Sequence, residues 1–182
     1  LDLTQIFVDF QQANDSIDRD QLFGILSFFQ IPMKLIQLIR LTLVQTTAKV
    51  KLQSGTTDPF RVTRGLKQGD LLAPALFNLI HEYVIWKLSV DKNATLEHKL
   101  VQIVGYADDV NTMTRLHASA KETFQELNYA AEGIGLQVTP KKTQVMITTQ
   151  SKIRRPKHFE IGTEHIEIVN QFKYLGSWIT ED

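Results

Sequence analysis

Two adjacent carboxylates lie between two apolar, strand-like runs in the middle of the chain. Residues 100–104 (Leu-Val-Gln-Ile-Val) are mostly apolar and β-branched, and residues 110–113 (Val-Asn-Thr-Met) alternate apolar with polar side chains. Two such runs around a small turn predict a β-hairpin with Asp108 and Asp109 at its tip. Paired carboxylates repel each other unless water or a cation screens them. The pair therefore indicates either a metal site or a solvated turn, since Asp is also a common turn residue.

A second carboxylate lies inside an apolar run near the start of the chain. Alternation along residues 6–10 places Phe7 and Asp9 on one face of a strand and the other three side chains on the opposite face. A charge inside a buried strand costs roughly several kcal/mol unless it is paired or binds a cation. We therefore expect Asp9 to lie at a strand end or to have a partner.

Composition narrows the function classes. The 182 residues fit one domain with a substantial core, and the absence of cysteine excludes disulfides, thiolate metal sites and a cysteine nucleophile. Formal net charge is zero, but residues 140–158 contain six Lys or Arg and no Asp or Glu. Such a stripe is typical of phosphate contacts, or else of a solvated loop. No apolar run approaches the roughly 20 residues that span a bilayer, so we expect no membrane partner.

The starts of three helices are predicted by capping or first-turn residues. Asp15 or Ser16 can cap a helix whose apolar residues follow at helical spacing, and Pro32 suits the first turn of a second helix. Ser119 and Glu122 predict a capping box at the start of a later helix.

Strands and loops occupy most of the rest. A polar loop between glycines, residues 65–70, leads into a helix over residues 71–88, which is an arrangement that lets backbone N–H groups approach a ligand. Further strand-like runs cover residues 46–52, 60–63, 144–148, 159–161, 166–168 and 172–179.

The order of these features resembles the palm of reverse transcriptases, most closely those of non-LTR retrotransposons. Any one motif is weak, but five in register are specific, and they cover nearly the whole chain. The matching stretches are 7–16 (Phe-Val-Asp-Phe-Gln-Gln-Ala-Asn-Asp-Ser), 65–70 (Gly-Leu-Lys-Gln-Gly-Asp) with Pro74 and 76–79, 106–109 (Tyr-Ala-Asp-Asp), Gly135-Leu136 with Lys142-Thr143, and 172–176 (Phe-Lys-Tyr-Leu-Gly).

The resemblance implies an α+β polymerase palm, in which helices cover one face of an antiparallel sheet and the carboxylates lie on the other. Residues 1–182 would form a partial reverse transcriptase domain: 1–16 the first palm strand, 17–63 the later fingers portion, 64–158 the palm and 159–182 the primer-grip hairpin. Both ends look cut from a longer polyprotein, so the N-terminal fingers and the thumb would be absent. The sequence leaves the localisation within the cell, nucleus or cytoplasm, unknown.

The resemblance also implies the catalytic groups. Two divalent ions, Mg²⁺ with Mn²⁺ as an alternative, would be held by Asp9, Asp108 and Asp109 and by the carbonyl of Phe10. Lys142 resembles the lysine that can protonate the leaving pyrophosphate, although neighbouring Lys141 leaves that assignment open.

Contacts to substrates follow in the same way, for an RNA template, a DNA primer and a dNTP. The expected nucleotide-binding residues are Asn14, Gln68, Gly69 and Tyr106. The expected primer and template contacts are Tyr174, Leu175, Gly176, Lys152, Arg154 and Arg155. For Gln68 a purely structural role in tying down its loop stays open.

One departure from the family concerns sugar selection. Reverse transcriptases normally have Phe or Tyr five positions after the first catalytic Asp, and that ring excludes a ribose 2′-hydroxyl. Here the residue is Asn14, which is smaller and can hydrogen-bond a hydroxyl. We therefore hypothesise poor discrimination against ribonucleotides, with decay of the element copy as the other explanation.

Three interpretations follow. The first is an RNA-directed DNA polymerase core, and the intact Asp9, Asp108 and Asp109 favour it. The second is a domesticated or decayed palm that binds RNA without catalysis. The third, an RNA-dependent RNA polymerase palm, ranks lowest, because that class usually has Gly where this chain has Ala107.

Overall fold

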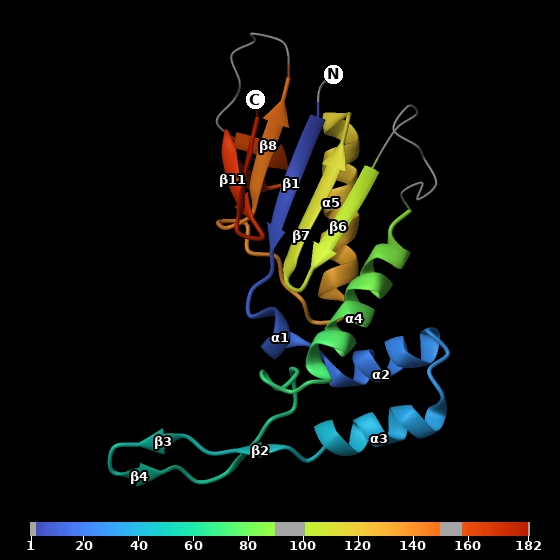
Figure 1. Ribbon diagram of the computed structural model, residues 1–182, viewed down its shortest axis with the longest axis vertical. Helices are drawn as coiled ribbons and strands as arrows, with labels where there is room; N and C mark the ends of the chain where they lie inside the picture. Colours follow the sequence, from blue (N-terminus) through green and yellow to red (C-terminus); the bar gives the residue numbers. More distant parts are fainter. Residues whose placement is uncertain (1–2, 90–100, 150–157, 182) are drawn as a thin grey trace.

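An upright sheet backed by helices rests above a lower layer of helices and a long arm (Figure 1). The structure is a computed structural model and describes residues 3–89, 101–149 and 158–181. Within these stretches, no helix combines the length and the apolar character needed to cross a membrane.

The sheet has six strands in the order β6-β7-β1-β8-β10-β9. All neighbours are antiparallel except β8 and β10, which pair in parallel. The central position of β1 places the strand that carries Asp9 between β7 and β8. The bounds are β1 (Leu3–Asp9), β6 (Val101–Tyr106), β7 (Asp109–Thr114), β8 (Gln144–Thr148), β9 (His158–Ile161) and β10 (Glu164–Ile168).

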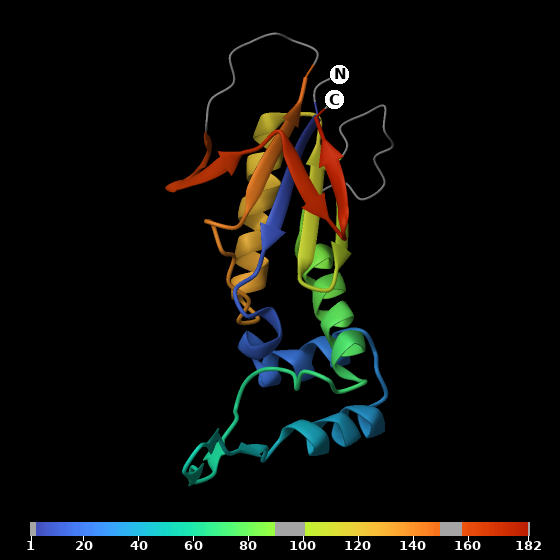
Figure 2. The same ribbon diagram turned by 60° about the vertical axis from the view of Figure 1, so that its left-hand side comes forward.

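Helices cover one face of this sheet. Helix α5 (His117–Glu132) runs behind β1 and β7, and α4 (Ala73–Lys87) lies beside β6 and extends below it (Figure 2). Ile6 and Val8 of β1 are buried in the core together with Phe124 and Leu127 of α5. The apolar side chains at alternate positions of β1 thus pack against the apolar face of α5, as the sequence predicts.

A separate hairpin covers the opposite face. Strands β11 (Gln171–Tyr174) and β12 (Ser177–Thr180) pair only with each other. The ring of Phe172 stacks on that of Phe7, with centroids 3.9 Å apart and planes 15° from parallel. Phe7 is consequently 2% exposed although it points away from the main core. The carboxylate face is therefore partly closed by this hairpin.

The lower layer begins directly after β1. It contains α1 (Ala13–Ser16), α2 (Arg19–Phe28) and α3 (Met33–Leu43), and then an arm made of the four short strands β2 (Thr47–Ala48), β3 (Lys51–Leu52), β4 (Gly55–Thr56) and β5 (Phe60–Arg61). Asp18, rather than Asp15 or Ser16, caps α2 by accepting from the N–H groups of residues 20 and 21. That sequence prediction was wrong because both earlier residues lie within or at the end of α1.

The guanidinium of Arg19 ties this layer together. It is 8% exposed and donates to the carbonyls of Gly65, Leu43 and Val62 and to the hydroxyl of Thr46. These acceptors come from the end of α3, both sides of the arm and the loop before α4. The buried guanidinium of Arg19 therefore fixes the position at which the arm leaves the rest of the domain.

The predicted α+β class, with helices on one face of the sheet, is confirmed. Two details differ. Helix α5 begins at His117 with Leu116 as its cap, so Ser119 and Glu122 lie inside it and form no capping box. Residues 159–182 are not one hairpin, because β9 and β10 join the large sheet and only β11 and β12 stand apart.

Candidate active site

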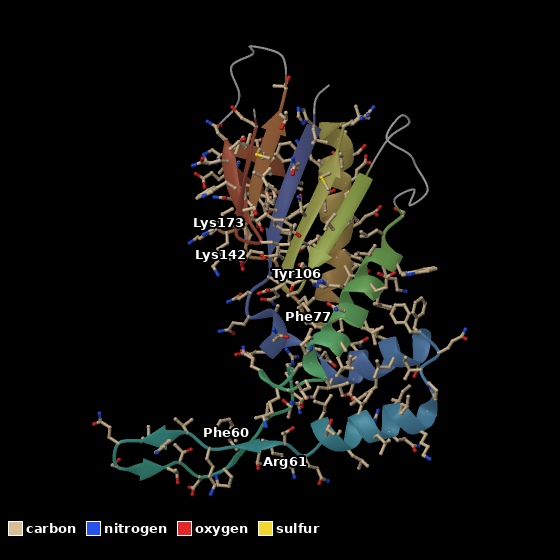
Figure 3. The ribbon with its side chains drawn as sticks, viewed as in Figure 1. Phe60, Arg61, Phe77, Tyr106, Lys142 and Lys173 are labelled. Atoms are coloured by element: carbon tan, nitrogen blue, oxygen red, sulfur yellow. The ribbon has the colours of Figure 1, made fainter. Side chains whose placement is uncertain are left out.

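Three carboxylates meet at one end of the central strands. Asp9 ends β1 and Asp109 begins β7, and the antiparallel register sets them directly opposite each other. Tyr106 pairs with Asp109 across β6 and β7, so the connecting turn contains only Ala107 and Asp108. Figure 3 labels Tyr106 and Lys142 near this end of the sheet. The predicted hairpin is confirmed, and its tip brings the Asp pair beside a residue about 100 positions earlier in the chain.

The hairpin turn is strained at Ala107. Its φ is 53°, in the left-handed region that costs an L-residue with a Cβ roughly 1–2 kcal/mol. Two-residue hairpin loops need a positive φ at the first central position, where glycine is normal. The tight turn is thus kept without glycine, and it fixes Asp108 between two paired strands.

The charges in this cluster oppose one another. Burial raises the pKa of Asp109, and the negative charges of Asp108 and then Asp9 raise it further. The Oδ2 atom of Asp9 is buried and has no hydrogen-bond partner among the described residues. A cation at this position would relieve both the repulsion and the unsatisfied oxygen.

A loop after α5 holds Asp9 from its backbone. The Asp9 carbonyl accepts from the Thr139 N–H at 2.7 Å, and the Asp9 N–H donates to the Thr143 hydroxyl at 3.3 Å. This loop carries Lys142, whose Nζ lies 3.7 Å from Asp9 Oδ2. The structure thus places Lys142 beside the carboxylates. This position favours Lys142 over the neighbouring Lys141 as the candidate lysine.

The donor set suits Mg²⁺ or Mn²⁺. In the described part of the chain, no three acidic or histidine side chains converge closely enough to enclose a metal by themselves. Mg²⁺ commonly takes one or two carboxylates and completes its shell with water and substrate phosphates. The backbone hydrogen bonds on either side of Phe10 are made by the Asp9 carbonyl and the Gln11 N–H, and neither of them uses the Phe10 carbonyl. The residues therefore fit a metal that arrives with its substrate.

A cavity of about 1030 Å³ adjoins the hairpin tip. All four residues expected to bind the nucleotide line it: Asn14, Gln68, Gly69 and Tyr106. Gly69 has a φ of +82°, and the loop after it leads directly into α4. The structure thus brings these four residues from three separate segments to one cavity.

Sequence reasoning missed His81, which also lines this cavity. Its side chain is 7% exposed, and its ring lies 4.6 Å from that of Phe77 and 6.0 Å from that of Phe10, centroid to centroid. Burial lowers the pKa of His81 to about 4, against a smaller opposite effect of Asp108. Gly105 of β6 lies directly against the ring, since an added Cβ there would lie 3.4 Å from His81 Nδ1. The only sequence signal was the i, i+4 spacing of Phe77 and His81 on α4.

The β11–β12 hairpin approaches the carboxylates with Tyr174. Its hydroxyl donates to the Val104 carbonyl at 3.5 Å, and burial followed by the charge of Asp109 raises its pKa. Leu175 and Gly176 both have positive φ, as a two-residue turn of this hand requires. Lys152, Arg154 and Arg155 lie outside the described residues.

The sequence matches the family described as "Reverse transcriptase (RNA-dependent DNA polymerase)" over residues 3–179. The chain therefore belongs to the reverse transcriptase family. Members of this family generally use divalent metal ions.

Curated relatives refine this placement. The chain is 21% identical over 178 residues to the "Retrovirus-related Pol polyprotein from type-1 retrotransposable element R2" of Nasonia vitripennis, covering 93% of the chain and 17% of the relative. It is 22% identical to the R2DM polyprotein of Drosophila melanogaster, covering 93% and 17%. The predicted resemblance to non-LTR retrotransposon enzymes is confirmed, and the chain spans under a fifth of these two polyproteins.

Solved structures share the fold. Apo telomerase from Candida tropicalis superimposes with a TM-score of 0.73 at 14% identity, covering 98% of this chain and 31% of that one. Telomerase from the same organism in complex with a TWJ fragment of telomeric RNA gives 0.69 at 15% identity, covering 91% and 30%. This likeness confirms the palm architecture.

Proposed function

We propose that this chain is the catalytic core of an RNA-directed DNA polymerase of a non-LTR retrotransposon. It would transfer a nucleotide from a dNTP to the 3′-hydroxyl of a DNA primer on an RNA template. The observation that carries this proposal is the direct pairing of Asp9 with Asp109, with Asp108 beside them at a two-residue turn. Family membership supports this interpretation over an RNA-dependent RNA polymerase.

The carboxylates would act as metal ligands. Two divalent ions, when bound, stabilise the attacking 3′-oxygen and the leaving pyrophosphate. Asp9 and Asp108 would be the principal ligands, with Asp109 and the Phe10 carbonyl as further ligands. Their fixed backbone positions at paired strand ends hold the ligands in place before substrate arrives.

Lys142 would have two states. Without metal its ammonium lies 3.7 Å from Asp9 Oδ2 and partly neutralises that carboxylate. In the second state its flexible side chain would reach the pyrophosphate, where Nζ would act as the proton donor. The proton would move from Nζ to the leaving phosphate oxygen.

The substrates would lie on either side of the hairpin tip. The cavity lined by Asn14, Gln68, Gly69 and Tyr106 has room for the incoming nucleotide and its template base. The turn Tyr174-Leu175-Gly176, which lies across the sheet face, would position the primer end. The basic residues Lys152, Arg154 and Arg155 would add phosphate contacts to the template.

One observation favours the alternative, a palm that binds RNA without catalysis. Lys142 already pairs with Asp9, so that carboxylate has a counter-charge in the absence of metal. In a decayed copy this ion pair would persist and exclude cations from the site.

Isothermal titration calorimetry with Mg²⁺ and Mn²⁺, in the presence of primer–template and dNTP, separates the two functions. The polymerase proposal predicts metal binding by the parent chain and its loss in Asp108→Asn. Equal or absent metal binding in both proteins, with the parent cooperatively folded, would instead support the non-catalytic palm.

A further inference from the structure

The arm formed by residues 46–63 leaves the body between α3 and the loop that carries Gln68. Figures 1 and 2 show it extending well beyond the helices, with only its base close to them. Its strands pair Thr47 with Arg61, Ala48 with Phe60 and, farther out, Lys51 with Thr56. An isolated two-stranded ribbon is at best marginally stable in water, so an arm of this kind is suited to a partner.

The two faces of the arm differ in chemistry. Lys51 begins β3, Lys49 lies two positions earlier between β2 and β3, and Arg61 of β5 lies opposite Thr47 of β2, so alternation along an extended segment places these three cations on one face. The other face carries Val50, Leu52 and Phe60, each about half exposed. Figure 3 labels Phe60 and Arg61, neighbours on β5 that alternation directs to opposite faces.

The basic face is free to take an anion. Lys49, Lys51 and Arg61 are all exposed, and within the described stretches none of them forms an ion pair. Asp58 is the one carboxylate in the arm sequence. Side chains two apart on a strand are separated by about 6.6 Å, close to the spacing of successive phosphates along an extended nucleic-acid strand.

The arm is continuous with the cavity wall. After β5 the chain passes through the exposed cations Arg64 and Lys67 and reaches Gln68 and Gly69, which line the cavity. A nucleic-acid strand that passes the cavity therefore meets positive charge along this path rather than bare solvent.

We propose that the basic face of the arm binds the phosphate backbone of single-stranded RNA beyond the cavity. The identity of that strand as template rests on the proposed function, but its binding needs only the arm. Such contacts add affinity and position the strand without reading its sequence.

The test is the salt dependence of RNA binding, measured by fluorescence anisotropy of a labelled single-stranded RNA over a KCl series. Each phosphate contact on a single strand contributes about 0.7 to the slope of log K against log salt. The triple variant Lys49→Gln, Lys51→Gln, Arg61→Gln should lower that slope by about 2 and weaken binding on the order of 100-fold at 0.1 M salt. Exchanging the lysines for Arg and Arg61 for Lys keeps the charges and should restore the slope.

A matched control removes three cations elsewhere: Lys34→Gln on α3, Lys87→Gln on α4 and Lys121→Gln on α5. The control has the same net charge as the arm variant, and its slope of log K against log salt should differ from the parental slope by no more than about 0.5. Equal losses in the two triple variants, or a parent that binds no RNA, would overturn the inference. Calorimetric metal binding in the presence of dNTP and without RNA should not change in the arm variant, so failure of the arm and failure of the catalytic site are distinguishable.

Discussion

The ring of His81 is enclosed between Phe77 and Phe10 on the cavity wall, next to the hairpin that carries Asp108. The imidazole stays neutral, because the hydration that its charged form would lose outweighs the attraction of the Asp108 carboxylate. Its Nε2 has no hydrogen-bond partner among the described residues. The stability of this wall therefore depends on pH through the protonation of His81.

The pH dependence has a definite sign. The pKa of His81 is lowered to about 4 in the folded chain from 6.5, so between these values the unfolded chain binds a proton that the folded chain does not. The free energy of unfolding should fall as the pH falls from 6.5 to 4, by up to about 3 kcal/mol. Urea unfolding across this range should show that His81→Leu removes this part of the pH dependence. The same change at exposed His165 should leave it in place; identical pH profiles for both variants would contradict the account.

Asn14 sets a second prediction at the scale of one residue. It lines the cavity, and its carbonyl accepts from the Leu66 N–H at 2.7 Å, which fixes its backbone against the loop with Gln68. Because Asn is small and can hydrogen-bond a hydroxyl, a polymerase containing this domain should incorporate ribonucleotides readily. Asn14→Phe should raise the preference for dNTP over rNTP at least about tenfold in primer extension. A strong dNTP preference in the parent would show that Asn14 does not control sugar selection.

Among the elements, α1 depends on close backbone contacts from two sides. A Cβ at Gly65 would lie 2.7 Å from the Asp15 carbonyl oxygen, and a Cβ at Gly135 would lie 2.6 Å from that of Ser16. Both glycines have positive φ, +80° and +88°. The short helix that carries Asn14 is thus held between two loops that only glycine allows to approach.

Gly135→Ala should therefore be strongly destabilising, by about 2–4 kcal/mol, from backbone overlap and left-handed strain together. Gly24→Ala is the matched control, because Gly24 lies in α2 with no atom within 4 Å of an added Cβ. That change should stabilise the chain by about 0.5–1 kcal/mol through helix propensity. Thermal unfolding of the two variants measures the contrast, and shifts of the same sign would refute it.

Much of each element could be predicted from local pattern. The period of two in residues 100–113 and the apolar spacing of α2, α4 and α5 suffice for the hairpin and the helices. Caps were harder to predict, since Asp15, Ser16 and Asp18 are all residue types that cap helices, and Leu116 makes no side-chain cap hydrogen bond at all. Burial of Phe7 and the four contacts of Arg19 could not be predicted, because their partners lie far away in the sequence.

At the scale of the whole molecule, the order of motifs predicted which residues meet, but not how the sheet is ordered. Asp9, Asp108 and Asp109 converge as expected, and Asn14 and Gln68 share one cavity. The parallel pairing of β8 with β10 gave no sequence signal, because strand order depends on long-range contacts. Metal ligation and the role of Lys142 stay predictions.

The chain on its own should extend a primer poorly. Its cavity is open, and none of the described residues that line it is a Lys or Arg that could hold a triphosphate, whereas positioning provides much of the rate in nucleotidyl transfer. Primer extension on an RNA template by the isolated chain should be close to background. Robust extension would show that positioning by further domains is not needed.

The most direct measurement is anomalous X-ray scattering from crystals of the chain soaked in Mn²⁺ with a dNTP. The account predicts a manganese peak beside the carboxylates of Asp9 and Asp108 or Asp109, with the Lys142 ammonium displaced from Asp9. A site without manganese under these conditions, with Lys142 still paired to Asp9, would contradict the claim that these carboxylates form a polymerase centre.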